Sequence, residues 1–170
     1  MEMFQIARLA ANHLTQQTTP EYPVVPVQMP TAPIYLIDGK MDMKEPKVFY
    51  DELKRTVTGG LNSEQVSVVN KVMKYANHWQ VSWLAYALAT TWHESRFKLV
   101  EEIGKGRGRP YHKPGKYGQG QWGRGLPQLT WDRNYEWADK ALGLKGALLK
   151  NFNLALDADI SAKLMVLGME

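Results

Sequence analysis

The sequence predicts a mainly α-helical domain with long loops, preceded by an extended N-terminal arm. Beyond Val48, apolar residues recur at helical spacing in several separate segments. Residues 18–47 instead hold six of the nine prolines, and proline removes backbone donors and favours extended chain. We therefore expect residues 1–47 to form an arm or linker and residues 48–170 to form one helical domain. A length of 170 residues suits one domain with an appendage.

Within the arm, residues 1–17 carry an apolar stripe at helical spacing, which predicts a short helix that needs a partner surface. Residues 34–40 read as a strand that ends in an Asp-Gly turn. A proline-stiffened arm of this kind either docks onto a neighbouring protein or forms a disordered tail, and the residues alone do not decide between the two.

The helical domain has clear start signals. Asn62 and Gln65 form a capping-box pattern, which predicts a helix that runs to about Ala76. A second helix is expected over residues 82–95. That segment is apolar nearly all round, so we expect it to be the buried centre of the domain.

Two further helices are expected after a long loop that is rich in glycine and basic residues, residues 103–121. Thr130 is the expected N-cap of the third helix, and Gly143 stands just past its end. The last helix is expected to start near Asp157.

Composition sets limits on compartment and partners. The chain has no cysteine, so no disulfide framework is possible. It has no apolar run that could span a bilayer, and its N-terminus lacks the pattern of a signal peptide. The net charge of +4 favours association with anionic polymers such as peptidoglycan, teichoic acid or nucleic acid, although a merely soluble basic protein is an equal interpretation.

Glu94 is the first candidate for chemistry because it closes an apolar helix beside Trp92. A general acid must hold its proton near neutral pH, and partial burial favours the protonated form. The alternative is a helix-end glutamate that pairs with Arg96 or Lys98, and composition alone favours that alternative.

Three ordered motifs carry a family resemblance, and they are ATTWHES at residues 89–95, EEIGKGRGRPY at 101–111 and WGRGLPQLTWDRNY at 122–135. Together they resemble glycoside hydrolase family 19, which contains plant-type (class I-like) chitinases and the lysozyme-like endolysins of bacteriophages. The similarity runs from about Phe49 to the C-terminus and is closer to the muralytic branch. The resemblance implies a lysozyme-like α-helical fold in which two carboxylates flank a groove that holds a glycan.

The resemblance also assigns roles to individual residues. Glu94 matches the catalytic acid, and Glu102 matches the second carboxylate; the loop between them is two residues shorter than in the relatives, so Glu101 remains an alternative. Thr130 matches a position that helps to hold the attacking water. The residues that correspond to substrate-binding positions are Glu101, Tyr111, Trp122, Gln128 and Asn134.

Other site types are not supported by the sequence. His93-Glu94 would need a second histidine at position 97 to resemble a zinc protease, but that position is Phe97. No Gly-Lys-Ser/Thr step exists, so a phosphate-binding loop is not expected. We expect no metal, no cofactor and no nucleic-acid partner. The basic stretch from Lys105 to Arg124 could grip phosphate or wall polymer, or be a solvated loop.

The sequence therefore predicts a glycosidase that cuts the glycan backbone of peptidoglycan, with chitin as a second possible substrate. We expect a phage lysis protein, located in the virion or the host cytoplasm and acting at the cell wall. The rival hypothesis is a virion structural or assembly protein that keeps this fold and contacts other virion proteins through residues 1–47. The family pattern continues past the position of Glu170 with a further helix and cleft wall. If that wall is missing, the groove is half-built, unless the chain is processed from a longer one or another subunit completes the groove.

Overall fold

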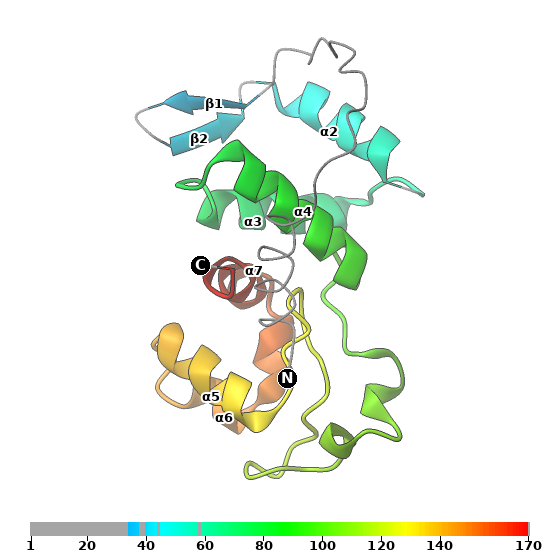
Figure 1. Ribbon diagram of the computed structural model, residues 1–170, viewed down its shortest axis with the longest axis vertical. Coiled ribbons are helices and arrows are strands. Elements are labelled where there is room, and N and C mark those ends of the chain that lie inside the picture. Colours follow the sequence, from blue (N-terminus) through cyan, green and yellow to red (C-terminus); the bar gives the residue numbers. More distant parts are fainter. Residues whose placement is uncertain (1–33, 38–39, 44, 58, 170) are drawn as a thin grey trace, which may run out of the picture.

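The computed structural model describes residues 34–37, 40–43, 45–57 and 59–169, so the helix expected in residues 1–17 and the stretch up to residue 33 lie outside the described residues. The described chain is mainly helical, as predicted (Figure 1). Its elements in chain order are β1 (Ile34–Ile37), β2 (Lys40–Met43), α2 (Pro46–Thr56), α3 (Ser63–Tyr75), α4 (Val81–Ser95), η1 (Ile103–Gly106), η2 (Pro110–His112), α5 (Asp132–Ala141), α6 (Ala147–Lys150), η3 (Phe152–Leu156) and α7 (Ala158–Leu167).

The strand expected at residues 34–37 is present and is the first half of a hairpin. β1 pairs with β2 in antiparallel register, with Ile34 opposite Met43 and Ile37 opposite Lys40. The second strand was not predicted. The Asp-Gly step between the two strands lies outside the described residues.

Local capping fixes the start of two helices where the sequence predicts them. The Asn62 side chain accepts a hydrogen bond from the Gln65 amide while the Gln65 side chain accepts one from the Asn62 amide, which confirms the capping box of α3. The Asp157 carboxylate accepts hydrogen bonds from the amides of Asp159 and Ile160 at the start of α7. Both helices therefore have fixed first turns, from which their apolar faces are aimed into the core.

Helix α7 joins two hydrophobic clusters. Above it in Figure 1, α3 and α4 pack against one face, with Val69, Leu84 and Met165 in a shared core. Below it, α5, α6 and η3 enclose a second cluster, in which the rings of Tyr135 and Phe152 stack 3.7 Å apart. The long loop that carries η1 and η2 lies between α4 and α5 and extends beside this second cluster. One end of the loop follows α4, which packs in the first cluster, and the other end leads into α5, which packs in the second.

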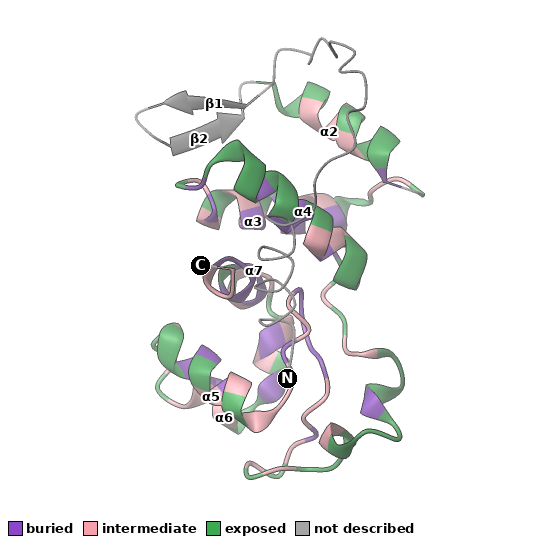
Figure 2. Cartoon of the chain, viewed as in Figure 1, coloured by how far each residue is buried: buried purple, intermediate pink, exposed green. Residues whose placement is uncertain are grey.

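Helix α4 is not the buried centre that the sequence predicts. Only one face, which includes Leu84, Ala87 and Leu88, is buried, and the other is exposed over much of its length (Figure 2). Trp83 and Tyr86 keep 53% and 51% of their surface exposed. The periodicity of an all-apolar helix does not reveal which face is buried. In this structure α3 and α7 pack against only one side of α4.

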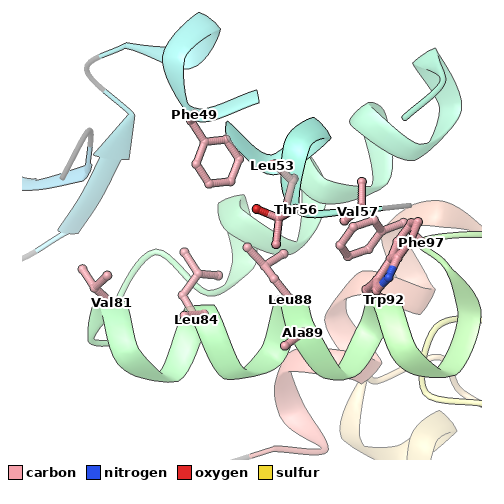
Figure 3. Close-up of a pocket in the computed structure, with 11 residues that line it drawn as sticks. Phe49, Leu53, Thr56, Val57, Val81, Leu84, Leu88, Ala89, Trp92 and Phe97 are labelled. Atoms are coloured by element: carbon pink, nitrogen blue, oxygen red, sulfur yellow. The ribbon is translucent and has the colours of Figure 1, made fainter. Parts of the chain in front are cut away.

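A shallow apolar groove of about 340 Å³ lies between α2 and α4, with Phe49 and Leu53 on one side and Val81, Leu88 and Trp92 on the other (Figure 3). Helix α2 begins at Pro46, two residues before the expected domain boundary, and this helix was not predicted. None of the helices in the described part of the chain is long and apolar enough to cross a bilayer.

Candidate active site

Glu94 is the penultimate residue of α4 and is followed by a tight turn. Arg96 and Phe97 both adopt left-handed backbone conformations, with φ of 54° and 56°. Such conformations cost roughly 1–3 kcal/mol each outside glycine and persist only where the surroundings hold them. Here the Phe97 side chain is fully buried, and the side-chain Nε2 of Gln65 donates to the Arg96 carbonyl oxygen at 2.7 Å. The helix end that carries Glu94 is therefore anchored to the hydrophobic cluster formed by α3, α4 and α7.

The Glu94 side chain is 35% exposed, and His93 Nδ1 lies 3.5 Å from its Oε1. Within the described residues, neither Arg96 nor Lys98 forms an ion pair with Glu94, which removes the structural role that composition favours. The Arg96 guanidinium instead lies 4.8 Å from the centre of the Trp92 ring. Glu94 is thus a partly covered carboxyl whose one ion-pair contact in the described chain is its exposed neighbour His93.

Glu101 is the tightly bound carboxylate of the site. Its Oε1 accepts a hydrogen bond from Trp122 Nε1 at 2.8 Å and lies 3.4 Å from Arg124 Nε, while its Oε2 lies 3.0 Å from Lys105 Nζ. Burial alone would raise its pKa. The hydrogen bonds from Trp122 and Lys105 and the nearby charges of Lys105 and Arg124 together hold the pKa of Glu101 below its ordinary value. Glu101 is therefore an ionised group committed to three partners.

Arg124 is the buried cation that organises this region, with only 3% of its surface exposed. Its Nη1 donates to the carbonyl oxygens of Gly120 and Trp122, and its Nε donates to Asn153 Oδ1 at 3.0 Å. Its guanidinium also lies 4.5 Å from the centre of the Trp122 ring. Arg124 therefore has a structural role, and the same residue fixes Glu101 and Trp122.

Glu102 has a different environment, although it is the next residue. Its Oε1 accepts a hydrogen bond from the Tyr111 hydroxyl at 2.9 Å, and its Oε2 accepts one from the Gly123 amide at 3.1 Å. The described residues place no lysine, arginine or histidine at ion-pair distance from it. Burial and the bond to Glu102 both raise the pKa of Tyr111, so its hydroxyl remains a donor at neutral pH. Glu102 is oriented by neutral donors and remains half-exposed.

Tyr111 connects Glu102 to an open hollow. Its ring meets the Trp131 ring edge-on at 5.4 Å, and Trp131 lines a hollow of about 450 Å³ together with Gln121, Asp132 and Arg133. Trp131 has a φ of 73°, an unfavourable conformation for a tryptophan. Its backbone is held there by a hydrogen bond from its amide to the Gln121 carbonyl oxygen. The hollow is therefore built on a fixed aromatic wall beside the Tyr111–Glu102 pair.

The segment from Gln128 to Asn134 is held by bonds from side chain to backbone. Gln128 Nε2 donates to the carbonyl oxygens of Val100 and Gly125, Thr130 Oγ1 donates to the Gln128 carbonyl oxygen at 2.7 Å, and Asn134 Nδ2 donates to that of Thr130. The Gln128 side-chain amide therefore stabilises the loop through two backbone carbonyls. No described residue donates a hydrogen bond to the side-chain oxygens of Thr130 and Asn134.

Thr130 is not the N-cap of α5, contrary to the prediction. The N-cap position belongs to Trp131, and the first helical amide, that of Asp132, donates to Gln121 Oε1 at 3.0 Å. Gln121 comes from a separate segment, so no local pattern at the start of α5 could have revealed this cap. Gly143 does follow the end of α5, with a φ of 64°, as expected.

The predicted residues gather around two connected centres. Glu101 and Trp122 meet at Arg124, and Glu102 and Tyr111 meet beside Gly123, with Gln128 packed against that glycine. No hydrogen bond or ion pair within the described chain joins Glu94 to either centre. The sequence did not point to Trp131, Asp132 or Arg133 as site-lining residues; the only signal was their position inside the third motif.

Comparisons of the chain with protein-family models, with curated proteins and with solved structures gave no match. The glycoside hydrolase 19 resemblance therefore rests on the three sequence motifs, and the chemistry of the site has to be argued from its own geometry.

Proposed function

We propose that this chain is a glycoside hydrolase that cuts the glycan backbone of peptidoglycan by acid–base catalysis. The observation that carries the proposal is the contrast between the two adjacent glutamates. Glu101 is neutralised by Lys105 and Arg124, whereas Glu102 is oriented by a hydroxyl and an amide and keeps its charge uncompensated. A carboxylate of the second kind is suited to take a proton from water.

In the proposed reaction, Glu94 protonates the glycosidic oxygen that leaves, and Glu102 takes a proton from the attacking water. This division of labour is the single-displacement mechanism, which inverts the anomeric centre and needs carboxyl groups roughly 6.5–9.5 Å apart. Glu94 stands at the anchored end of α4, and Glu102 follows seven residues after the end of that helix, directly before η1. Thr130 and Asn134 present oxygen acceptors that can orient the water, because their donor groups are already bound to backbone carbonyls.

The hollow beside Trp131 supplies a place for a sugar. An aromatic ring next to polar side chains is the usual surface for a pyranose, whose C–H face packs on the ring. Chitin shares the same β-linked backbone, so it is the second candidate substrate. We place the activity in phage lysis, at the bacterial cell wall.

Mass analysis of the fragments released from purified peptidoglycan tests the proposal. Glycosidic cleavage yields saccharide fragments with new reducing ends, whereas amidase action yields free peptides and intact glycan strands. Proton NMR of the first product made from a soluble oligosaccharide then reports the anomer, and inversion is expected. Peptide release without new reducing ends, or no release from either peptidoglycan or chitin, would overturn the proposal.

A further inference from the structure

The loop that bears Tyr111 carries cations that the fold does not use. Six lysines and arginines lie between Glu102 and Asp132, with no acidic residue among them. Three of the six are engaged: Lys105 and Arg124 bind Glu101, and Lys116 binds Glu136. The other three are exposed, and they are Arg107, Arg109 and Lys113. None of these three forms an ion pair or a side-chain hydrogen bond with any residue in the described chain.

These cations continue into the hollow described above. Gln121, which lines the hollow, donates its amide to the Lys113 carbonyl oxygen at 3.3 Å, and its backbone amide donates to the Tyr111 carbonyl oxygen. Arg133 forms part of the hollow wall and is also exposed, with no ion pair among the described residues. Arg133 therefore lies in the wall of the hollow, Lys113 is joined to it through Gln121, and Arg107 and Arg109 are exposed on the same loop.

Asp132 is the one acidic residue in the hollow wall, and its carboxylate is not free there. Its Oδ2 accepts a hydrogen bond from the Lys116 amide at 2.5 Å, and its Oδ1 is shielded from solvent. Against this single carboxylate, the hollow wall and the adjoining loop together carry four cations without an ion pair among the described residues, so the net charge of the surface is positive. The field of such a surface attracts and orients anionic ligands and weakens as salt is added.

We infer that this surface, made of Arg107, Arg109, Lys113 and Arg133, binds the carboxylate side groups of an acidic glycan, and so selects peptidoglycan over neutral chitin. The inference rests on the proposed function for the type of ligand. A glycan is favoured over a nucleic acid because the same loop supplies Tyr111, which holds Glu102, and the opening has one aromatic wall rather than a series of stacking rings. The glycan backbone would then bind in the hollow beside Trp131 while its carboxylate side groups bind the cations of the loop.

The test measures binding apart from hydrolysis. Every protein carries Glu94→Gln so that the glycan is not consumed, and its co-sedimentation with insoluble peptidoglycan and with chitin is measured from low to high salt. One variant adds Arg107→Glu, Arg109→Glu and Lys113→Glu. The matched control adds Lys54→Glu, Lys140→Glu and Lys150→Glu, which change the net charge equally at exposed positions elsewhere. A Gln version of the first triple variant separates loss of attraction from added repulsion.

The loop variant should bind peptidoglycan about tenfold more weakly at low salt, while the control variant and binding to chitin change little. The difference should shrink as salt increases. Equal weakening by the loop and control variants, or equal affinity for the two glycans, would overturn the inference. Tighter, loop-dependent binding of duplex DNA than of peptidoglycan would also overturn it and would identify a nucleic-acid surface.

A parallel hydrolysis assay with Glu94 intact separates this inference from the proposed function. Cleavage of both glycans with charge-independent binding rejects the inference alone. Charge-dependent binding of peptidoglycan without any cleavage rejects the proposed function and leaves the surface in place.

Discussion

The Tyr111 hydroxyl donates a hydrogen bond to Glu102 Oε1 at 2.9 Å, and the Gly123 amide donates to the other oxygen of the same carboxylate. The two donors come from different segments and hold the carboxylate from both sides. Glu102 therefore has a fixed orientation without a compensating positive charge, which is the property that separates it from Glu101. The predictions below follow from that difference and from the anchoring of Glu94.

Glu94→Gln keeps the size and polarity of the side chain but cannot deliver a proton. Because proton transfer contributes about 10²–10⁴-fold to such reactions, turnover on peptidoglycan should fall by at least that factor. Thermal unfolding should change little, since the carboxyl has only the His93 contact among the described residues. Glu64→Gln, an exposed position in the first turn of α3, is the control. Near-normal turnover of the Glu94 variant would remove this residue from the mechanism.

Glutamine substitutions at the two neighbouring glutamates should have different effects on turnover and on stability. Glu102→Gln should abolish most turnover with little loss of stability, because it removes the base while its amide oxygen can accept from the Gly123 amide and its NH₂ group can donate to the Tyr111 hydroxyl. Glu101→Gln should leave more turnover but lower the free energy of unfolding by about 1–3 kcal/mol, since Lys105 and Arg124 lose their anionic partner. Paired kinetic and urea-unfolding measurements check both. The opposite ranking in turnover would reassign the base to Glu101.

The Glu101 contribution should depend on pH with a defined sign. Its pKa is lowered in the folded protein, so its stabilising effect is complete above the unfolded pKa and is lost as pH falls through the folded one. The difference in unfolding free energy between the wild type and Glu101→Gln should therefore be largest at neutral pH and disappear in acid. A difference that stays constant down to pH 2–3 would show that the ion pairs are not its source.

Arg124→Met should destabilise the fold by about 3–5 kcal/mol, because it leaves several buried acceptors and Glu101 without their shared cation. Arg133→Met is the matched control, since Arg133 is exposed and should change stability by less than about 0.5 kcal/mol. Urea unfolding measures both. Equal stability of the two variants would mean that the Arg124 network contributes little.

The free energy of unfolding at alkaline pH should depend on the ionisation of Tyr135. Burial raises its pKa to about 12, and the nearby Arg124 only partly offsets that effect. Its stabilising contribution is present below the unfolded pKa near 10 and is lost as pH rises towards 12, at a cost of about 2–3 kcal/mol. Tyr135→Phe should lose less stability than the wild type over this range. Burial also raises the pKa of Tyr50 to about 12. Tyr50→Phe is therefore the matched comparison for Tyr135→Phe.

The fold was predictable where the signal is local. The capping box at Asn62, the start of the last helix near Asp157 and the glycine after α5 each depend on residues within one helical turn, and all three predictions are confirmed. The predictions that were wrong concern distant partners. Thr130 looks like a cap, but Gln121 from another segment takes that role, and the exposed face of α4 depends on which helices lie beside it.

The candidate site follows the same division. The motifs favour Glu102 over Glu101 as the second carboxylate but do not settle the choice, because most of the partners that distinguish the two side chains lie about 10–20 residues further along the chain. Trp122 and Arg124 bind the first, and Tyr111 and Gly123 bind the second. The cations of the loop could be counted in the sequence, but only the structure shows that Arg107, Arg109 and Lys113 form no ion pair with any of the described residues.

The left-handed turn after Glu94 makes the candidate acid vulnerable to changes in a residue that no substrate would touch. Phe97 is fully buried, and its ring lies 5.5 Å from that of Trp92, so it secures the turn from inside the protein. In a genetic screen for loss of lysis, we therefore expect Phe97 to yield partial-loss alleles alongside Glu94. Their defect would lie in aiming the carboxyl, and would be suppressed by second-site changes that refill the core.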